Sequence, residues 1–250
     1  EILNKRIIEE EHKRSAAPVG EQEAVPATDR FVDLSHVIED GLITYRGLPG
    51  PVIIDHITRE DSRDYYAEGT EFQIGRIEMV GNTGTYLDMP FHRYPAGADL
   101  AGVVLEKVSN VPGVVVRVTG MEESAIDWHH FAPIDCDGHA VLVHTDWDRH
   151  WGSEQYFDPV HPHLTEKAVE CLVDQGAALV GIDSVNIDDT TTGTRPAHSV
   201  LLAAEIPVVE HLTNLGELPT SGFRFSAVPP MISGMGTFPV RAHARIPVAR

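Results

Sequence analysis

The chain has 250 residues, with 19 lysines and arginines against 38 aspartates and glutamates, so its formal net charge is −19. An excess of negative charge this large disfavours nucleic acids and anionic membranes as partners, and neither is expected. Hydrophobic residues make up 42% and charged residues 23% of the sequence, a globular mixture that excludes disorder along the whole chain. A chain of this length is expected to bury a sizeable core.

The composition also predicts a cytoplasmic protein. No stretch approaches the roughly 20 consecutive apolar residues that a membrane-spanning helix needs. The first 14 residues are charged and lack the apolar segment of a signal peptide. Cys136 and Cys171 are too few for a disulfide framework, so both are expected to be reduced and to act as small hydrophobic residues.

Residues 1–30 are expected to form an N-terminal helix and linker arm. Residues 1–14 place isoleucine and leucine among charges in a short amphipathic helix pattern, which is too short to be stable alone in water. Such a helix is expected to pack on the body or on a neighbouring subunit. Residues 15–29 contain two prolines and a glycine, as linkers do. The main domain is expected to span residues 31–250.

Short apolar stretches in the main domain predict strands. They cover residues 52–54, 72–74, 111–118, 140–144, 177–183 and 208–209. A helix is expected between the fourth and fifth of these stretches, with Thr165 as its N-cap and Gly176 just after its C-terminus. A shorter helix is expected after His198, through residues 200–204. Strands with intervening helices predict an α/β domain with a mixed sheet.

Residues 81–97 are the segment that says most about the chemistry of the protein. Tyr86 and Asp88 are two positions apart, so in an extended segment they face the same way. Pro90 ends regular strand pairing, and His92 follows on a loop. An aspartate and a histidine beside such a turn could form a metal site or an acid–base site. A hydrogen-bonded turn aspartate with a surface histidine is the alternative.

A second polar group lies downstream. His198 and Glu210 are 12 residues apart and are flanked by apolar residues, where a polar side chain is costly to bury without partners. Together with Asp88 they would provide two carboxylates and one imidazole. This set suits Zn²⁺ or Mn²⁺ with open positions for water. A buried salt-bridge network is the alternative.

The sequence resembles the metal-dependent hydrolase family of bacterial kynurenine formamidases, isatin hydrolases and cyclases. The motif of that family is His-x-Gly-Thr-His-x-Asp-x-Pro-x-His. Residues 82–92 read Asn-x-Gly-Thr-Tyr-x-Asp-x-Pro-x-His, so five of the seven fixed positions match. The resemblance spans roughly residues 31–246 and includes residues 33–36, 181–183, 198–202, 210–215 and 238–242.

The resemblance implies a compact mixed-sheet domain of the barrel-like, swivelling β/β/α kind, in a homodimer or homotetramer. It assigns Asp88, His198 and Glu210 as metal ligands. It assigns His92 as the group that accepts and returns a proton. Tyr45 matches an aromatic residue that lines the substrate pocket of the family.

Two motif histidines that bind metal in the family are replaced here by Asn82 and Tyr86. Asparagine is a poor Zn²⁺ ligand, and a phenol with a pKa of about 10 binds metal only when it loses its proton. A single Zn or Mn ion is therefore the simplest expectation. A metal-free site and a rebuilt two-metal site remain alternatives. Tyr86 could instead donate a hydrogen bond to a substrate oxygen or fill the space, with Asn82 orienting Tyr86 or the substrate.

These residues predict a hydrolase that acts on an amide, cyclic amide or lactone bond of a small molecule. The reaction would use metal-activated water with His92 as general acid and base. Arg195 could bind a substrate carboxylate through two hydrogen bonds, and an internal ion pair is its alternative. Two other function classes stay open. They are a metal-free cyclase or dehydratase that uses Tyr86 and His92, and a non-catalytic ligand-binding protein on the same fold.

Several other polar residues are expected to be structural. Asp183, Asp188 and Asp189 flank the end of a predicted strand, where caps and turns are their expected roles. His161 and His163 have a spacing that could suit a metal. They are nevertheless expected on a solvated loop.

Overall fold

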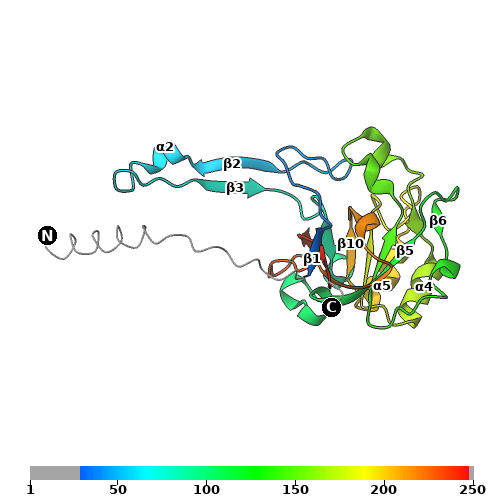
Figure 1. The fold of residues 1–250 in the computed structure, drawn as a ribbon. Coiled ribbons are helices and arrows are strands. Elements are labelled where there is room, and N and C mark those ends of the chain that lie inside the picture. The colour runs from blue at the N-terminus through cyan, green and yellow to red at the C-terminus, as the bar shows by residue number, and fades with distance from the viewer. Residues whose placement is uncertain (1–28, 248–250) are drawn as a thin grey trace.

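The computed structural model of the protein describes residues 29–247. The predicted N-terminal helix lies outside these residues, as does nearly all of the predicted arm, so the domain boundary at residue 31 remains a prediction. Within the described range, a large mixed sheet curls into a half-barrel, with a few helices packed against it (Figure 1). The α/β class with a mixed, barrel-like sheet is therefore as predicted.

Nine strands form the main sheet, with parallel pairing at its centre. Their spatial order is β1 (Arg30–Asp33), β13 (His243–Ile246), β11 (Ser221–Ser226), β5 (Val111–Arg117), β7 (Ala140–His144), β9 (Leu179–Ile182), β10 (Val208–Glu210), β4 (Tyr86–Asp88) and β12 (Thr237–Pro239). The β5–β7, β7–β9 and β9–β10 pairs are parallel, and the other neighbours are antiparallel. β10, β4 and β12 thus lie side by side although they are far apart in the sequence.

The central strands are buried on both faces. Along β7, Val141 and Val143 belong to one apolar layer, whereas Ala140 and Leu142 belong to the opposite layer. A strand covered on both faces is apolar at consecutive positions rather than at alternate ones. This explains why the bounds predicted for residues 140–144 agree with those of β7.

Two helices pack against the layer that contains Val141 and Val143. α4 (Glu166–Asp174) has the predicted cap, because Thr165 Oγ1 accepts a hydrogen bond from the amide of Ala168 at 3.2 Å. α5 (Pro196–Ala203) begins earlier than predicted, at a proline, which favours the first helical turn. His198 therefore lies inside the first turn of α5, not before it.

The remaining elements are short. They are α2 (Arg59–Ser62), α3 (Leu105–Val108), a β6 (Ala125–Ile126) and β8 (His163–Leu164) pair, and single 3₁₀ turns such as Pro90–His92, Leu100–Gly102, Trp128–His130, Trp147–His150, Glu154–Phe157 and Leu215–Glu217. Among residues 29–247, no helix combines the length and the apolar character needed to cross a membrane.

A two-stranded ribbon extends away from the body of the molecule (Figure 1). It consists of β2 (Val52–Ile57) and β3 (Ile74–Glu78), which are antiparallel. The sequence predicted β2 but placed the second strand at residues 72–74. Phe72 precedes the paired segment and is exposed, so an apolar run was mistaken for the strand itself.

The prediction for His161 is wrong. Its side chain is fully buried, not solvated. Its Nδ1 lies 3.1 Å from Ser184 Oγ, and its Nε2 lies 3.1 Å from Thr190 Oγ1. Two hydroxyl partners satisfy both ring nitrogens, so this histidine is structural. His163 is half-buried in β8.

Candidate active site

Neighbouring strands bring two of the predicted metal ligands to one face of the sheet. In the antiparallel pairing of β4 with β10, Tyr86 lies opposite Glu210 and Asp88 lies opposite Val208. Side chains two positions apart on a strand, and those directly across from them, share a face. Asp88, Tyr86 and Glu210 therefore point to the same side, as the spacing of Tyr86 and Asp88 predicted.

α5 contributes the third predicted ligand, His198. Its Nδ1 lies 2.6 Å from Asp188 Oδ2, while its Nε2 lies 3.5 Å from Asp88 Oδ2 and 3.7 Å from Glu210 Oε1. Asp188 also accepts hydrogen bonds from the amides of Ala197 and His198 at 2.6 and 3.1 Å. The predicted capping role of Asp188 is observed. Its second role, the orientation of a histidine by a carboxylate, was missed.

These three side chains fit a divalent cation. Their ligand atoms all lie within 4.8 Å of one another, and within residues 29–247 no other group of this kind is found. Asp88 Oδ2 is buried and has no hydrogen-bond partner among the described residues. An unpaired buried carboxylate oxygen is costly. One imidazole nitrogen with two carboxylate groups is a donor set that Zn²⁺ and Mn²⁺ accept.

The charges of the cluster depend strongly on one another. Burial disfavours the charge on His198, but Glu210, Asp188 and Asp88 together raise its pKa well above the ordinary value. Burial raises the pKa of Glu210 to about 7, against the opposing effect of His198. Burial also opposes ionisation of Asp88, yet its pairing with His198 and the nearby His92 hold its pKa below the ordinary value. The buried carboxylates of Asp88 and Glu210 therefore favour a positive charge between them.

Tyr86 is a neutral, fully buried phenol. Burial raises its pKa well above the usual range, and the charges of Glu210 and Asp88 raise it further. Its hydroxyl donates to Glu210 Oε2 at 2.6 Å and lies 3.2 Å from His211 Nε2. The geometry thus assigns the hydroxyl hydrogen of Tyr86 to Glu210.

His211 and Tyr156 extend the hydrogen bonds of this phenol into the interior of the protein. Sequence reasoning missed both residues. Tyr156 Oη lies 2.8 Å from His211 Nδ1. Burial lowers the pKa of His211 to about 3, so its ring is neutral. Because Tyr86 gives its hydrogen to Glu210, His211 Nε2 must donate to Tyr86, and His211 Nδ1 accepts from Tyr156. No local pattern around residue 156 or 211 indicates this chain of hydrogen bonds.

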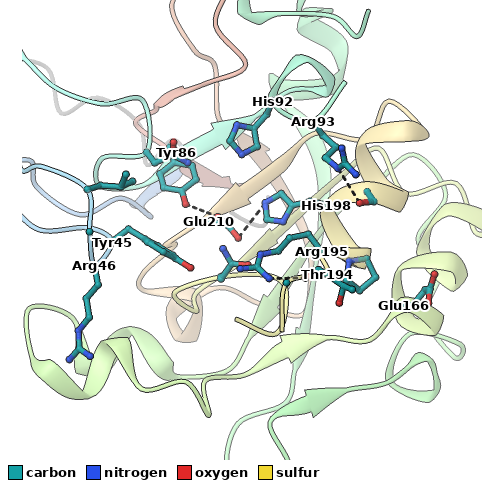
Figure 2. Close-up of a pocket in the computed structure, with 17 residues that line it drawn as sticks. Tyr45, Arg46, Tyr86, His92, Arg93, Glu166, Thr194, Arg195, His198 and Glu210 are labelled. Carbon is teal, nitrogen blue, oxygen red and sulfur yellow. Dashed lines mark hydrogen bonds and ion pairs between the residues drawn. The ribbon is translucent and has the colours of Figure 1, made fainter. Parts of the chain in front are cut away.

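A pocket of about 980 Å³ opens above the cluster (Figure 2). Of the eight predicted site residues, seven line it: Tyr45, Asn82, Tyr86, His92, Arg195, His198 and Glu210. Asp88 is fully buried next to the pocket. Arg46, Arg93 and Glu166 also line the pocket and were not predicted. The structure thus brings together residues that the sequence separates by as many as 165 positions, from Tyr45 to Glu210.

Arg195 has no carboxylate partner in residues 29–247. Its Nη1 donates to the backbone oxygens of Asp189, Thr192 and Thr194 at 3.2, 2.8 and 2.7 Å. The internal ion pair that was its alternative role is therefore not observed. In Figure 2, Tyr45 and Arg195 extend into the pocket from different segments. Burial raises the pKa of Tyr45, Glu210 adds to this rise, and the neighbouring Arg195 opposes it.

His92 lies on the pocket wall with 37% of its side chain exposed. Its ring centre is 6.0 Å from that of His198. Its Nδ1 lies 2.7 Å from the hydroxyl of Thr237 on β12, and this hydroxyl donates its hydrogen to Asp88. Thr237 is a further site residue that sequence reasoning missed, because it is 145 positions from His92.

Residues 32–189 match the family model described as Cyclase. The chain belongs to the Cyclase family. It is 26% identical over 217 residues to the kynurenine formamidase of Geobacillus thermodenitrificans, a match that covers 86% of this chain and 97% of the relative. It is 29% identical over 183 residues to the kynurenine formamidase of Paracidovorax citrulli, covering 70% and 80% of the two chains.

Solved structures of similar proteins share the Cyclase-family fold. Isatin hydrolase A from Labrenzia aggregata superposes with a TM-score of 0.75 at 23% identity, covering 88% of this chain and 94% of that one. A potential metal-dependent hydrolase with cyclase activity superposes with a TM-score of 0.70 at 22% identity, covering 88% and 100%. The predicted family, fold class and hydrolase class are confirmed.

Proposed function

We propose that the protein is a metal-dependent hydrolase that cleaves an amide, cyclic amide or lactone bond of a small molecule. One observation carries this proposal: a buried Asp88–His198–Glu210 cluster lies beside a pocket with a histidine, His92, on its wall. The kynurenine formamidases and isatin hydrolases among its relatives support the same reaction class.

Asp88, His198 and Glu210 would hold one divalent ion, Zn or Mn. Such an ion, when bound, supplies Lewis acidity that polarises a carbonyl oxygen and lowers the pKa of a water molecule. The replacement of two family metal ligands in this chain supports one bound ion rather than two. Asn82 and Tyr86 stand at the positions of two family ligands, and Tyr86 is held neutral by burial.

His92 would accept the proton of the attacking water and return it to the leaving nitrogen or oxygen. An imidazole suits this exchange, because it can gain and lose a proton near neutral pH. Its partly exposed ring on the pocket wall allows contact with a bound molecule.

The remaining predicted residues would bind the substrate. Arg195 presents to the pocket a guanidinium that has no carboxylate partner among the described residues, and Tyr45 lies beside it. A carboxylate or carbonyl oxygen of the substrate is the matching group. Asn82 lies next to Tyr86, whose hydroxyl would hold Glu210 in place. Donation from Tyr86 to a substrate oxyanion would require that the hydrogen bond to Glu210 break first.

The metal is tested by elemental analysis of protein purified without added metal or chelator. We expect about one equivalent of Zn or Mn in the wild type and loss of that metal in Asp88→Ala and His198→Ala, since each variant removes one of three ligands. Glu166→Ala is the matched control, because Glu166 lines the pocket outside the cluster. A wild type that contains no metal, and takes up none on incubation, would contradict the proposal.

The role of His92 is tested by His92→Ala on a panel of amides, cyclic amides and lactones. Loss of a general acid–base group is expected to lower turnover by roughly 10²–10⁴-fold, with the metal content unchanged. Full turnover in this variant would remove His92 from the mechanism. Turnover of this panel by a metal-free wild type that still needs His92 and Tyr86 would indicate metal-free acid–base chemistry instead.

A further inference from the structure

The hydroxyl of Thr237 lies between two groups of the proposed reaction. Its Oγ1 hydrogen-bonds Asp88 Oδ1 and lies 2.7 Å from His92 Nδ1. Thr237 is 5% exposed and Asp88 is fully buried. Water therefore has little access to the bond between Thr237 and Asp88, and the hydroxyl is fixed between its two neighbours.

Counting donors assigns the direction of both hydrogen bonds. A threonine hydroxyl has one hydrogen to donate, whereas an ionised carboxylate only accepts. The single hydrogen of Thr237 therefore goes to Asp88 Oδ1. The second contact of Thr237 Oγ1 is then made through a lone pair, so His92 Nδ1 must carry the hydrogen. The other ring nitrogen, Nε2, is left with its lone pair free.

The backbone next to Thr237 holds His92 as well. Thr237 lies opposite Asp88 in the pairing of β12 with β4, and the amide of Met89 donates to the oxygen of Gly236 at 2.7 Å. A Cβ added at Gly236 would lie 2.2 Å from the amide nitrogen of His92 and 2.6 Å from its Cα. Only glycine allows this approach, which brings the hydroxyl of Thr237 within reach of the ring.

We propose that Thr237 is a positioning residue that holds His92 as the Nδ1–H tautomer, so that Nε2 serves as the base of the hydrolase. The use of Nε2 as a base rests on the proposed function. The tautomer does not, because it follows from the contacts of Thr237 with an ionised Asp88 and with His92. Asp88 thereby serves two groups: Oδ1 accepts from Thr237, while Oδ2 faces His198 in the cluster.

The tautomer is measured by long-range ¹H–¹⁵N correlation of the imidazole nitrogens in the purified protein, at a pH where His92 is neutral. The His92 signals are those lost in His92→Gln. We expect the Nδ1–H form in the wild type and in Thr237→Ser, which keeps the hydroxyl. Thr237→Val keeps the shape but not the hydroxyl, so a mixture of both tautomers is expected. An Nε2–H ring in the wild type would overturn the proposal.

Turnover provides the second measurement. Thr237→Val is expected to lower kcat by roughly 10- to 100-fold, a part of what acid–base catalysis contributes, with KM within about twofold of wild type. Thr237→Ser is expected to recover most of kcat, and both variants should have the metal content of the wild type. Unchanged kcat in Thr237→Val would overturn the positioning role.

Thr145→Val is the matched control. Thr145 is also buried, and its hydroxyl donates to a buried carboxylate, Asp183, at 2.6 Å. It does not line the pocket of His92. We expect wild-type kcat and KM in this variant. Equal losses of kcat and Tm in Thr145→Val and Thr237→Val would show a merely structural effect and overturn the proposal. If no substrate is turned over by the wild type, the proposed function fails while the NMR result still decides the tautomer.

Discussion

At the scale of single residues, each side chain of the metal cluster is held by a partner from another part of the chain. Asp188 orients His198, Thr237 binds Asp88, and Tyr86 binds Glu210. Outer partners of this kind fix the orientation of metal ligands before the metal binds. The cluster is therefore expected to keep its geometry with and without the ion.

Tyr86→Phe tests the support of Glu210. The change leaves Glu210 Oε2 and His211 Nε2 without their shared partner in a buried site. An unpaired buried polar group costs about 1–3 kcal/mol, so we expect the free energy of unfolding to fall by about this amount, as measured by denaturant titration. Tyr94→Phe is the control, because its half-buried hydroxyl has one backbone partner, Ser199. An equal effect of both changes would argue against a special role for Tyr86.

At the scale of elements, close packing of β5 against β11 depends on a glycine. Gly113 faces the ring of Phe223, and a Cβ at this position would lie 2.1 Å from a ring carbon. Overpacking of a core costs typically about 1–3 kcal/mol, so Gly113→Ala is expected to lower the free energy of unfolding by that amount. Gly193→Ala, whose added Cβ would lie more than 4 Å from every heavy atom of residues 29–247 outside residues 192–194, should change it by less than about 0.5 kcal/mol. A stable Gly113→Ala variant would mean that Phe223 can move aside.

The β2–β3 ribbon exposes several large apolar side chains. Val52, Ile53, Ile54, Ile74 and Ile77 are each between 41% and 47% exposed. A two-stranded ribbon is marginally stable on its own, and clustered exposed apolar side chains mark interaction sites. We propose that this ribbon packs on a second copy of the chain, in the predicted homodimer or homotetramer. Residues 45–48, just before β2, line the pocket.

Sedimentation velocity tests this assembly. Ile53 lies directly opposite Ile77 in the ribbon, so Ile53→Lys with Ile77→Glu places opposite charges across the pair and preserves the hairpin. We expect a dimer or tetramer for the wild type and a smaller species for the double variant, because charges disfavour an apolar contact. Val104→Glu is the control at an exposed apolar position of the body. A monomeric wild type would refute the proposal.

At the scale of the whole molecule, buried neutral histidines make stability depend on pH. Burial lowers the pKa of His161 to about 4, whereas an unfolded histidine titrates near about 6.5. Between these values the unfolded chain binds a proton that the folded chain does not. Stability is therefore expected to fall as the pH drops from about 6.5 to 4, by up to about 3 kcal/mol from this residue.

His161→Gln is expected to flatten this dependence, as measured by denaturant unfolding at a series of pH values from 6.5 to 4. The comparison is of slopes, since the substitution also changes the stability at neutral pH. His56→Gln is the control, because His56 is exposed in β2, and its slope should match that of the wild type. Identical slopes for all three proteins would show that His161 does not contribute.

The sequence by itself determined the α/β class and the centre of the fold, and its motif at residues 82–92 carried the resemblance to the family. The central strand β7 was predictable, because burial on both faces requires consecutive apolar residues. The helix α4 was predictable, because Thr165 caps its start and Gly176 follows its end. The outer strand β11 was missed, since only Phe223 and Phe225 are buried in it. Asp88, His198 and Glu210 could be proposed because their residue types limit the chemistry that a buried site can perform.

Only the tertiary structure decided which side chains share a hydrogen. Thr237 meets Asp88 and His92 across 149 and 145 positions, and Tyr156 meets His211 across 55. A contact over such separations depends on strand order, which places β12 and β10 on either side of β4. No periodicity along the chain encodes that order, so the tautomer of His92 and the neutral state of Tyr86 emerge only when the sheet is assembled.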